Sequence, residues 1–309
     1  MTALIQMFSY HFMQRALIVG VLVSLCAALL GVSLVLKRYS MIGDGLSHVG
    51  FGALAVASAF NLAPLAVAVP VVVLAAILLL RLRQSAAVKG DAAIAMISSS
   101  ALAIGVISLS LSTGMNTEVS SYLFGSVLSL SRGDAVFSVL LSLAVIALFV
   151  LFYPRIFAVT FDESFSRATG TKTELFNTLL AVLTAITVVL GMRMMGALLI
   201  SSLIIFPALS AMRICRSFKA VVLVSACISV LCFLTGLLAS YFLETPTGAS
   251  IVIADLLAYG ICRLAGRKET NPRATALGLI DIPLFRQLRQ SSWPSSCAGG
   301  FHPHACRQR

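Results

Sequence analysis

Long runs of apolar residues dominate the chain, and polar residues collect in the short stretches between them. Each run is close to the roughly 20 residues that a helix needs to cross a bilayer. None shows the apolar–polar alternation of a membrane β-strand, and only helices and closed barrels satisfy their backbone in lipid. We therefore predict an all-α, polytopic membrane bundle of about nine transmembrane helices, within a range of eight to ten. The runs cover residues 13–36, 41–60, 64–80, 91–111, 134–153, 174–191, 196–212, 220–241 and 248–264.

Two segments depart from this pattern. The apolar stretch from Ser120 to Leu130 is too short to span comfortably and predicts a re-entrant or surface helix. Residues 269–309 are polar, basic and proline-bearing, so we expect residues 1–268 to form the membrane domain and the rest a disordered cytoplasmic tail. The tail ends with four residues at a spacing that zinc could use, although the segment is short for a structural zinc site. These residues are Cys297, His302, His304 and Cys306.

The composition supports a membrane protein. Of the 309 residues, 59% are hydrophobic and 11% are charged, whereas soluble domains carry about a quarter charged residues. So few charged residues cannot cover a surface that faces water, and a disordered chain would be far less apolar. The composition therefore excludes a soluble globular protein and a disordered one.

The formal charge of +11 gives the orientation of the bundle. Cytoplasmic loops of membrane proteins are enriched in lysine and arginine. With nine spans and the N-terminus outside, every basic residue except Arg15, Arg132 and Arg193 falls on the cytoplasmic side. We therefore expect an N-terminus outside the cell and a C-terminus in the cytoplasm.

An acid and a histidine lie inside the second span. Asp44 and His48 are four positions apart, so on a helix they share one face. A carboxylate and an imidazole form half of a site for a divalent first-row metal, and weak binding suits a conduit that must release its ion. Two such helices across a dimer axis would supply four ligands. The alternative is that Asp44 caps the helix and His48 bonds to its neighbours in a packed bundle.

Other polar or helix-breaking residues in the spans are weaker candidates. Asp255 lies in the last span, where a hydrogen-bonded helix contact is the favoured interpretation and a place in a transport path the alternative. Pro207 interrupts its helix, and Ser201 and Ser202 could line a path or satisfy the freed backbone. A kink tolerated by neighbouring helices explains Pro207 equally well.

Four blocks of sequence resemble one family of membrane proteins, the permeases of zinc- and manganese-importing ABC transporters, of the ABC-3 or metal cluster C9 type. The resemblance spans about residues 10–268, and the blocks stand in the family's order. They are KRYSMIGDGLSH at 37–48, YLFGSVL at 122–128, GALLISSLIIFPA at 196–208 and TPTGAS at 245–250.

The resemblance implies both a site and partners. Family permeases work as a pair of membrane subunits with two cytoplasmic ATPases and an extracytoplasmic metal-binding protein. The family's metal contacts in the translocation path match Asp44 and His48. The stretch 161–170, FDESFSRATG, is similar to the segment that docks on the ATPase, and the charge pattern also places it in the cytoplasm. Its matching residues are Phe161, Asp162, Glu163, Arg167 and Gly170; an ordinary polar loop is the alternative.

The function expected from residues and resemblance together is a permease subunit in a bacterial cytoplasmic membrane. It would move zinc or manganese inward, with iron as a further candidate, by alternating access and with no permanently bound cofactor. The chain has no G-x-x-x-x-G-K-[ST] loop, so ATP hydrolysis is expected on a separate partner. A stand-alone metal transporter or channel is the alternative. An intramembrane protease is remote, because neither G-x-S-x-G nor H-E-x-x-H occurs.

Overall fold

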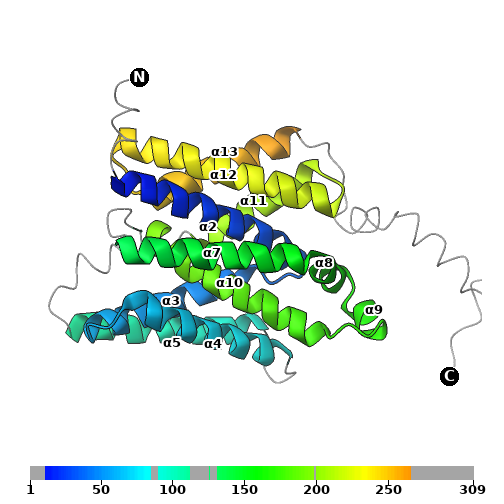
Figure 1. Cartoon of the computed structure of the whole chain (residues 1–309), viewed down its shortest axis with the longest axis horizontal. Coiled ribbons are helices and arrows are strands. Elements are labelled where there is room, and N and C mark those ends of the chain that lie inside the picture. Colours follow the sequence, from blue (N-terminus) through cyan, green and yellow to red (C-terminus); the bar gives the residue numbers. More distant parts are fainter. Residues whose placement is uncertain (1–10, 85–89, 112–124, 126–130, 198–199, 266–309) are drawn as a thin grey trace, which may run out of the picture. The chain divides into compact units, whose positions relative to one another are not determined.

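The computed structural model describes residues 11–84, 90–111, 125, 131–197 and 200–265. All the regular structure within these residues is α-helical (Figure 1). The helices are α2 (His11–Leu36), α3 (Ser40–Ala59), α4 (Pro64–Gln84), α5 (Gly90–Leu111), α7 (Arg132–Leu151), α8 (Tyr153–Phe161), α9 (Glu163–Ala168), α10 (Thr173–Met195), α11 (Ile200–Ile214), α12 (Phe218–Leu243) and α13 (Thr247–Ala265).

The predicted all-helical polytopic bundle is confirmed, and each predicted apolar run contains one helix of the described chain. Seven of these helices are long and apolar enough to cross a membrane. The two others are α11, which has 15 residues, and α3, which has 20 residues but carries several glycines and serines as well as Asp44 and His48. The predicted short helix at 120–130 and the tail at 269–309 lie outside the described residues, apart from Gly125.

The start of α11 differs from the sequence prediction. The apolar run begins at residue 196, but Gly196 has a φ of 90° and ends α10, so the next described helix begins only at Ile200. A positive φ is a backbone conformation that glycine adopts at little cost and that stops a right-handed helix. Because the residues on both sides of Gly196 are apolar, hydropathy alone does not reveal this break.

Helix α3 is held closely by its neighbours, packing against α4, α5, α10 and α11. A Cβ on Gly52 would lie 2.5 Å from the carbonyl oxygen of Ala101, and one on Gly45 would lie 2.6 Å from Ile94 Cγ2. Both neighbours belong to α5, so these glycines allow two helices of the same chain to approach closely. The helix that carries Asp44 and His48 is therefore fixed in the bundle by close helix-to-helix contact.

Aromatic rings pack α8 against the beginning of α12. Phe218 lies 4.9 Å from Phe157, 5.6 Å from Tyr153 and 5.7 Å from Phe161 between ring centroids. Aromatic pairs at these separations contribute about 0.5–1.5 kcal/mol each beyond their area burial. The short helix α8 therefore has a fixed position at the end of the bundle.

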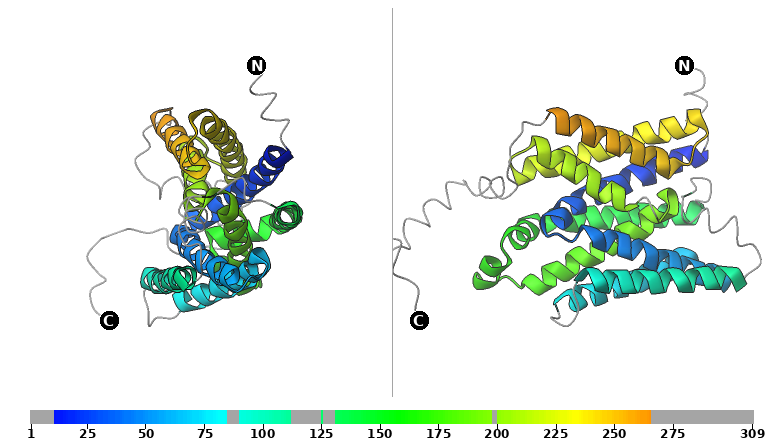
Figure 2. Two further views of the ribbon diagram at one scale, coloured as in Figure 1. Left: turned by 90° about the vertical axis from the view of Figure 1, so that its left-hand side faces the viewer. Right: turned by 180° about the vertical axis from the view of Figure 1, so that it is seen from behind.

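The two ends of the bundle differ in charge and in structure. At one end, α8 and α9 lie beside the linker that joins α2 to α3 (Figures 1 and 2). At the opposite end, Arg193 of α10 forms a largely buried ion pair of 2.7 Å with Asp134 of α7. The linkers that the charge pattern assigns to the cytoplasm include those on either side of α9, so we refer to that end as the cytoplasmic end.

Candidate metal site and coupling segment

Asp44 and His48 form a pair on one face of α3. The distance from His48 Nε2 to Asp44 Oδ2 is 3.9 Å, as expected for residues one helical turn apart. The Asp44 side chain is 41% exposed and that of His48 is 18% exposed. The carboxylate is therefore accessible, while the imidazole is largely enclosed beside it.

A third polar group reaches this pair from another helix. Ser201 of α11 donates a hydrogen bond of 3.3 Å from its Oγ to Asp44 Oδ1. Its neighbour Ser202 is half-buried and Pro207 is buried within α11, and the structure brings neither of them to Asp44. Of the weaker candidates on α11, Ser201 alone therefore joins the Asp44–His48 pair within the described structure.

The donor atoms of this site are suited to a metal but too few to hold one tightly. The Nδ1 atom of His48 is buried without a hydrogen-bond partner among the described residues. No group of three or more histidine, cysteine or acidic residues that could hold a metal occurs in that part of the chain. A carboxylate, an imidazole and a hydroxyl can bind a first-row divalent ion transiently, with the other ligands supplied from outside the chain.

Asp255 stands apart from this site. It lies on α13, is 1% exposed, and neither carboxylate oxygen has a hydrogen-bond partner among the described residues. It forms no metal-binding group with Asp44 and His48. The Cys232 side chain of α12 interacts with it across the helix contact, and both its place in a transport path and the expected hydrogen-bonded contact stay predictions.

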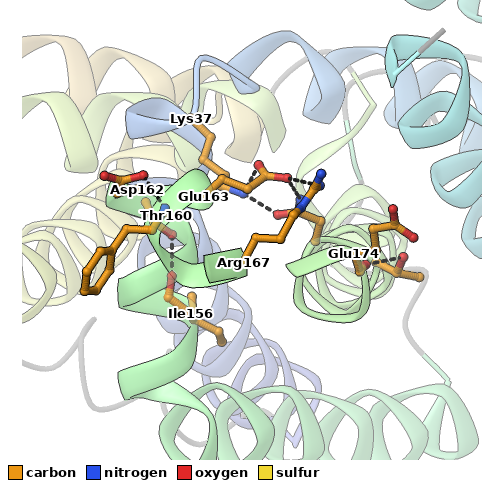
Figure 3. Close-up of polar contacts among 10 residues, drawn as sticks. Lys37, Ile156, Thr160, Asp162, Glu163, Arg167 and Glu174 are labelled. Atoms are coloured by element: carbon orange, nitrogen blue, oxygen red, sulfur yellow. Dashed lines mark hydrogen bonds and ion pairs between the residues drawn. The ribbon is translucent and has the colours of Figure 1, made fainter. Parts of the chain in front are cut away.

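The predicted ATPase-contacting segment folds into the end of α8 and the short helix α9 (Figure 3). Asp162 caps α9, since its Oδ1 accepts a hydrogen bond of 2.8 Å from the backbone N–H of Phe165. Gly170 follows the helix with a φ of 81°, which turns the chain towards α10. Local capping and a glycine stop therefore give this polar segment a defined shape.

Glu163 connects α9 to the linker between α2 and α3 and to α10 (Figure 3). One carboxylate oxygen lies 3.7 Å from Lys37 Nζ, and the other accepts a 3.1 Å hydrogen bond from Asn177 and lies 3.7 Å from Arg167. Lys37 also donates to the Asn177 side-chain oxygen. Lys37 belongs to the linker leading into α3, and Asn177 belongs to α10. The network therefore joins the segment to the linker that leads into the helix bearing Asp44 and His48.

Lys37 is the buried charge of the network, with its side chain 6% exposed, and it lies beside the buried Asn177. Burial lowers the pKa of the Lys37 ammonium, and the neighbouring Glu163 carboxylate opposes that shift. In the sequence, Lys37 stood out as a positive charge in a cytoplasmic loop and as the first residue of the block at 37–48. Its contact with Glu163 joins two positions that lie far apart in the chain. The local sequence pattern therefore could not predict this contact.

The two phenylalanines of the segment have different environments. Phe161 packs in the aromatic cluster with Phe157 and Phe218, at 4.8 Å and 5.7 Å between centroids. Phe165 is 46% exposed on α9. Sequence reasoning selected Phe161, whereas Phe165 is the more exposed ring of the two.

Comparison with known proteins gives the family. Residues 9–264 match the ABC 3 transport family, which covers most of the chain and all the helices that surround the Asp44–His48 pair. The chain belongs to the ABC 3 transport family. It is accordingly a multi-pass permease subunit of an ABC importer, and in such systems ATP is hydrolysed by a separate subunit. This confirms the expected division of labour and removes the stand-alone transporter and the protease from consideration.

Named relatives of this permease include importers of two metals. It is 27% identical over 250 residues to the manganese import system permease protein ScaB of Streptococcus gordonii, covering 81% of this chain and 90% of that one. It is 28% identical over 244 residues to the high-affinity zinc uptake system membrane protein ZnuB of Haemophilus influenzae, covering 79% and 94%.

A solved structure has the same fold. PsaBC from Streptococcus pneumoniae, determined in complex with a Fab, aligns with a TM-score of 0.79 and 27% sequence identity. The alignment covers 89% of this permease and 99% of that chain. The helical arrangement described above is therefore shared with that solved structure.

Proposed function

We propose that this permease passes zinc or manganese into the cytoplasm, with iron as a third candidate, and that Asp44 and His48 bind the ion on its way. One observation carries the proposal: the carboxylate and imidazole lie 3.9 Å apart on one face of α3, and Ser201 reaches the same carboxylate from α11. The names of ScaB and ZnuB, a manganese and a zinc importer, support a metal of this class. The donor atoms of Asp44 and His48 suit both ions.

The ion would complete its coordination with groups from outside the chain. Two protein ligands and a hydroxyl leave positions open on a metal that takes four or more ligands. We infer that a second permease subunit faces this one across a translocation path, and that an extracytoplasmic binding protein delivers the ion. Weak binding by each subunit would let the ion leave towards the cytoplasm once the path opens.

Transport would follow alternating access driven by a cytoplasmic ATPase. We infer that α9, with Phe165 and Arg167 exposed, docks on the ATPase. A displacement of α9 would act on Lys37 through Glu163, and Lys37 lies in the short linker before α3. The ATPase would thus move the helix that carries the metal ligands through a salt bridge and a short linker.

The site is tested by metal uptake into cells that depend on this importer. H48A removes the imidazole and should abolish uptake, while the amount of assembled transporter in the membrane stays the same. D44N, which keeps the shape of the side chain but removes its charge, should also lose uptake.

The variant H11A is the matched control, because it removes a histidine at the start of α2 that is not part of the Asp44–His48 pair. It should transport like the unaltered protein. Normal uptake by H48A would show that the ion does not depend on this residue. Measuring zinc and manganese uptake separately would identify the preferred ion.

A further inference from the structure

A groove runs between α2 and α7 at the end of the bundle opposite α8 and α9. It has a volume of about 390 Å³, within the range of small-molecule sites in proteins. Arg15 of α2 and Arg132 of α7 line it together. The rest of its lining is apolar and includes Ile18, Val136, Val139 and Leu140.

The two arginines of the groove differ from the third basic residue at this end. Arg193 is neutralised by Asp134 at 2.7 Å. Within the described residues, neither Arg15 nor Arg132 forms an ion pair with a carboxylate. Two unneutralised guanidinium groups beside one groove attract an anion, and guanidinium matches the geometry of phosphate oxygens.

The apolar lining continues from the arginines along the same helix faces. Ile18 lies three positions after Arg15, while Val136 and Leu140 lie four and eight positions after Arg132. Ile18, Val136 and Leu140 are 54%, 61% and 63% exposed. On helices that start near this end, these residues lie deeper in the bilayer than the arginines. The groove therefore offers positive charge at the membrane surface and apolar contact below it.

We propose that this groove binds an anionic phospholipid, with its phosphate between Arg15 and Arg132 and an acyl chain along Ile18, Val136 and Leu140. A phospholipid carries its charged headgroup at the membrane interface and its acyl chains towards the membrane centre. Its charged and apolar parts therefore follow the same order as the lining of the groove. An acidic loop of a soluble partner would match the arginines but would leave the exposed apolar lining in contact with lipid. On the orientation that the charges predict, the lipid belongs to the outer leaflet.

The proposal is tested with the purified full-length permease in detergent, by native mass spectrometry with added phosphatidylglycerol, phosphatidylethanolamine or glycerol phosphate. Phosphatidylglycerol should bind most strongly, and R15Q/R132Q should weaken it by about tenfold or more. R81Q/R213Q is the matched control, because it removes two exposed arginines from the cytoplasmic end and should bind like the unaltered protein. Equal losses in both double variants would overturn the proposal. Equal binding of glycerol phosphate would show that the apolar lining contributes nothing and would overturn it too.

Two further variants distinguish a bound lipid from an acidic segment of the chain itself. V136W fills the groove but keeps both arginines, so it should also reduce phosphatidylglycerol binding even if R15Q/R132Q proves unstable. Residues 112–130 contain one acid, Glu118, which could occupy the groove instead. In that case E118Q would raise phosphatidylglycerol binding severalfold and V136W would not lower it, and this result would refute the proposal.

Discussion

At the scale of single residues, Asp44 and His48 were predictable because the α-helix itself places positions four apart on one face. Local geometry sufficed to place them together, and the 3.9 Å between their side chains in the structure agrees with the spacing argument. The contact from Ser201 could not be predicted in the same way. It joins residues 157 positions apart and depends on how α11 packs against α3. Serine is also common in membrane helices, so its presence in the sequence carries little information.

Replacing Ser201 tests whether α11 contributes to the metal site. S201A removes the donor to Asp44 Oδ1 and leaves the carboxylate less well oriented. A hydrogen bond of this kind contributes about 1 kcal/mol, so the metal concentration for half-maximal uptake should rise about fivefold. Uptake of radioactive or fluorescently detected metal at several concentrations measures this.

The neighbouring variant S202A is the control for S201A, since among the described residues the hydrogen bond to Asp44 from α11 comes from Ser201 and not from Ser202. It should leave the half-maximal concentration unchanged. If both variants raise it equally, the effect belongs to the packing of α11 and the hydrogen bond has no special role.

At the scale of helices, hydropathy predicts where a helix lies but gives its ends only approximately. The predictions for α12 and α13 are within two residues of the observed bounds. The start of α11 is four residues later than predicted, because the break depends on the backbone conformation of Gly196. Helices α8 and α9 had no hydropathy signal of their own. They depend on a cap from Asp162 and on aromatic contacts with Phe218.

The link between α9 and the α2–α3 linker should be visible in stability. E163Q leaves the buried Lys37 ammonium without its carboxylate, and should lower the free energy of unfolding by about 1–3 kcal/mol. E174Q removes an exposed acid from the first turn of α10 and should have a smaller effect. Thermal unfolding in detergent compares the two.

A double variant shows whether Lys37 and Glu163 act as a pair. Adding K37M to E163Q should restore part of the lost stability, because no buried charge is then left alone. Uptake per ATP hydrolysed should stay low in the double variant, since the connection to α3 is still broken. Strictly additive losses of stability would contradict a coupled pair.

The close packing of α3 on α5 gives a further prediction. In G52A the added methyl group would lie 2.5 Å from the Ala101 carbonyl oxygen, so the helices must separate. We expect a loss of about 1–3 kcal/mol in stability. In the control G260A, where nothing lies within 4 Å of the added carbon, the better helix propensity of alanine should leave stability unchanged or slightly higher. Equal unfolding temperatures for the two variants would be inconsistent with this packing.

At the scale of the whole molecule, the orientation follows from charge and can be measured directly. In a cysteine-free background, L62C lies in the linker between α3 and α4, and S164C lies in α9; both positions are exposed. An impermeant maleimide should label L62C in intact cells and S164C only after permeabilisation. Labelling in the reverse order would invert the predicted topology.

The helices that hold the proposed metal ligands have a consequence for how the protein is made. In the described chain, α11 is too short, and α3 too weakly apolar, to count among the helices that can cross a membrane by length and composition alone. Since α3 packs on α5, which is synthesised later, it must stay near the insertion machinery until that partner emerges. The residues proposed to bind the ion thus make their own helices dependent on others for biogenesis. Substitutions at this site that raise hydrophobicity should therefore speed insertion even as they stop transport.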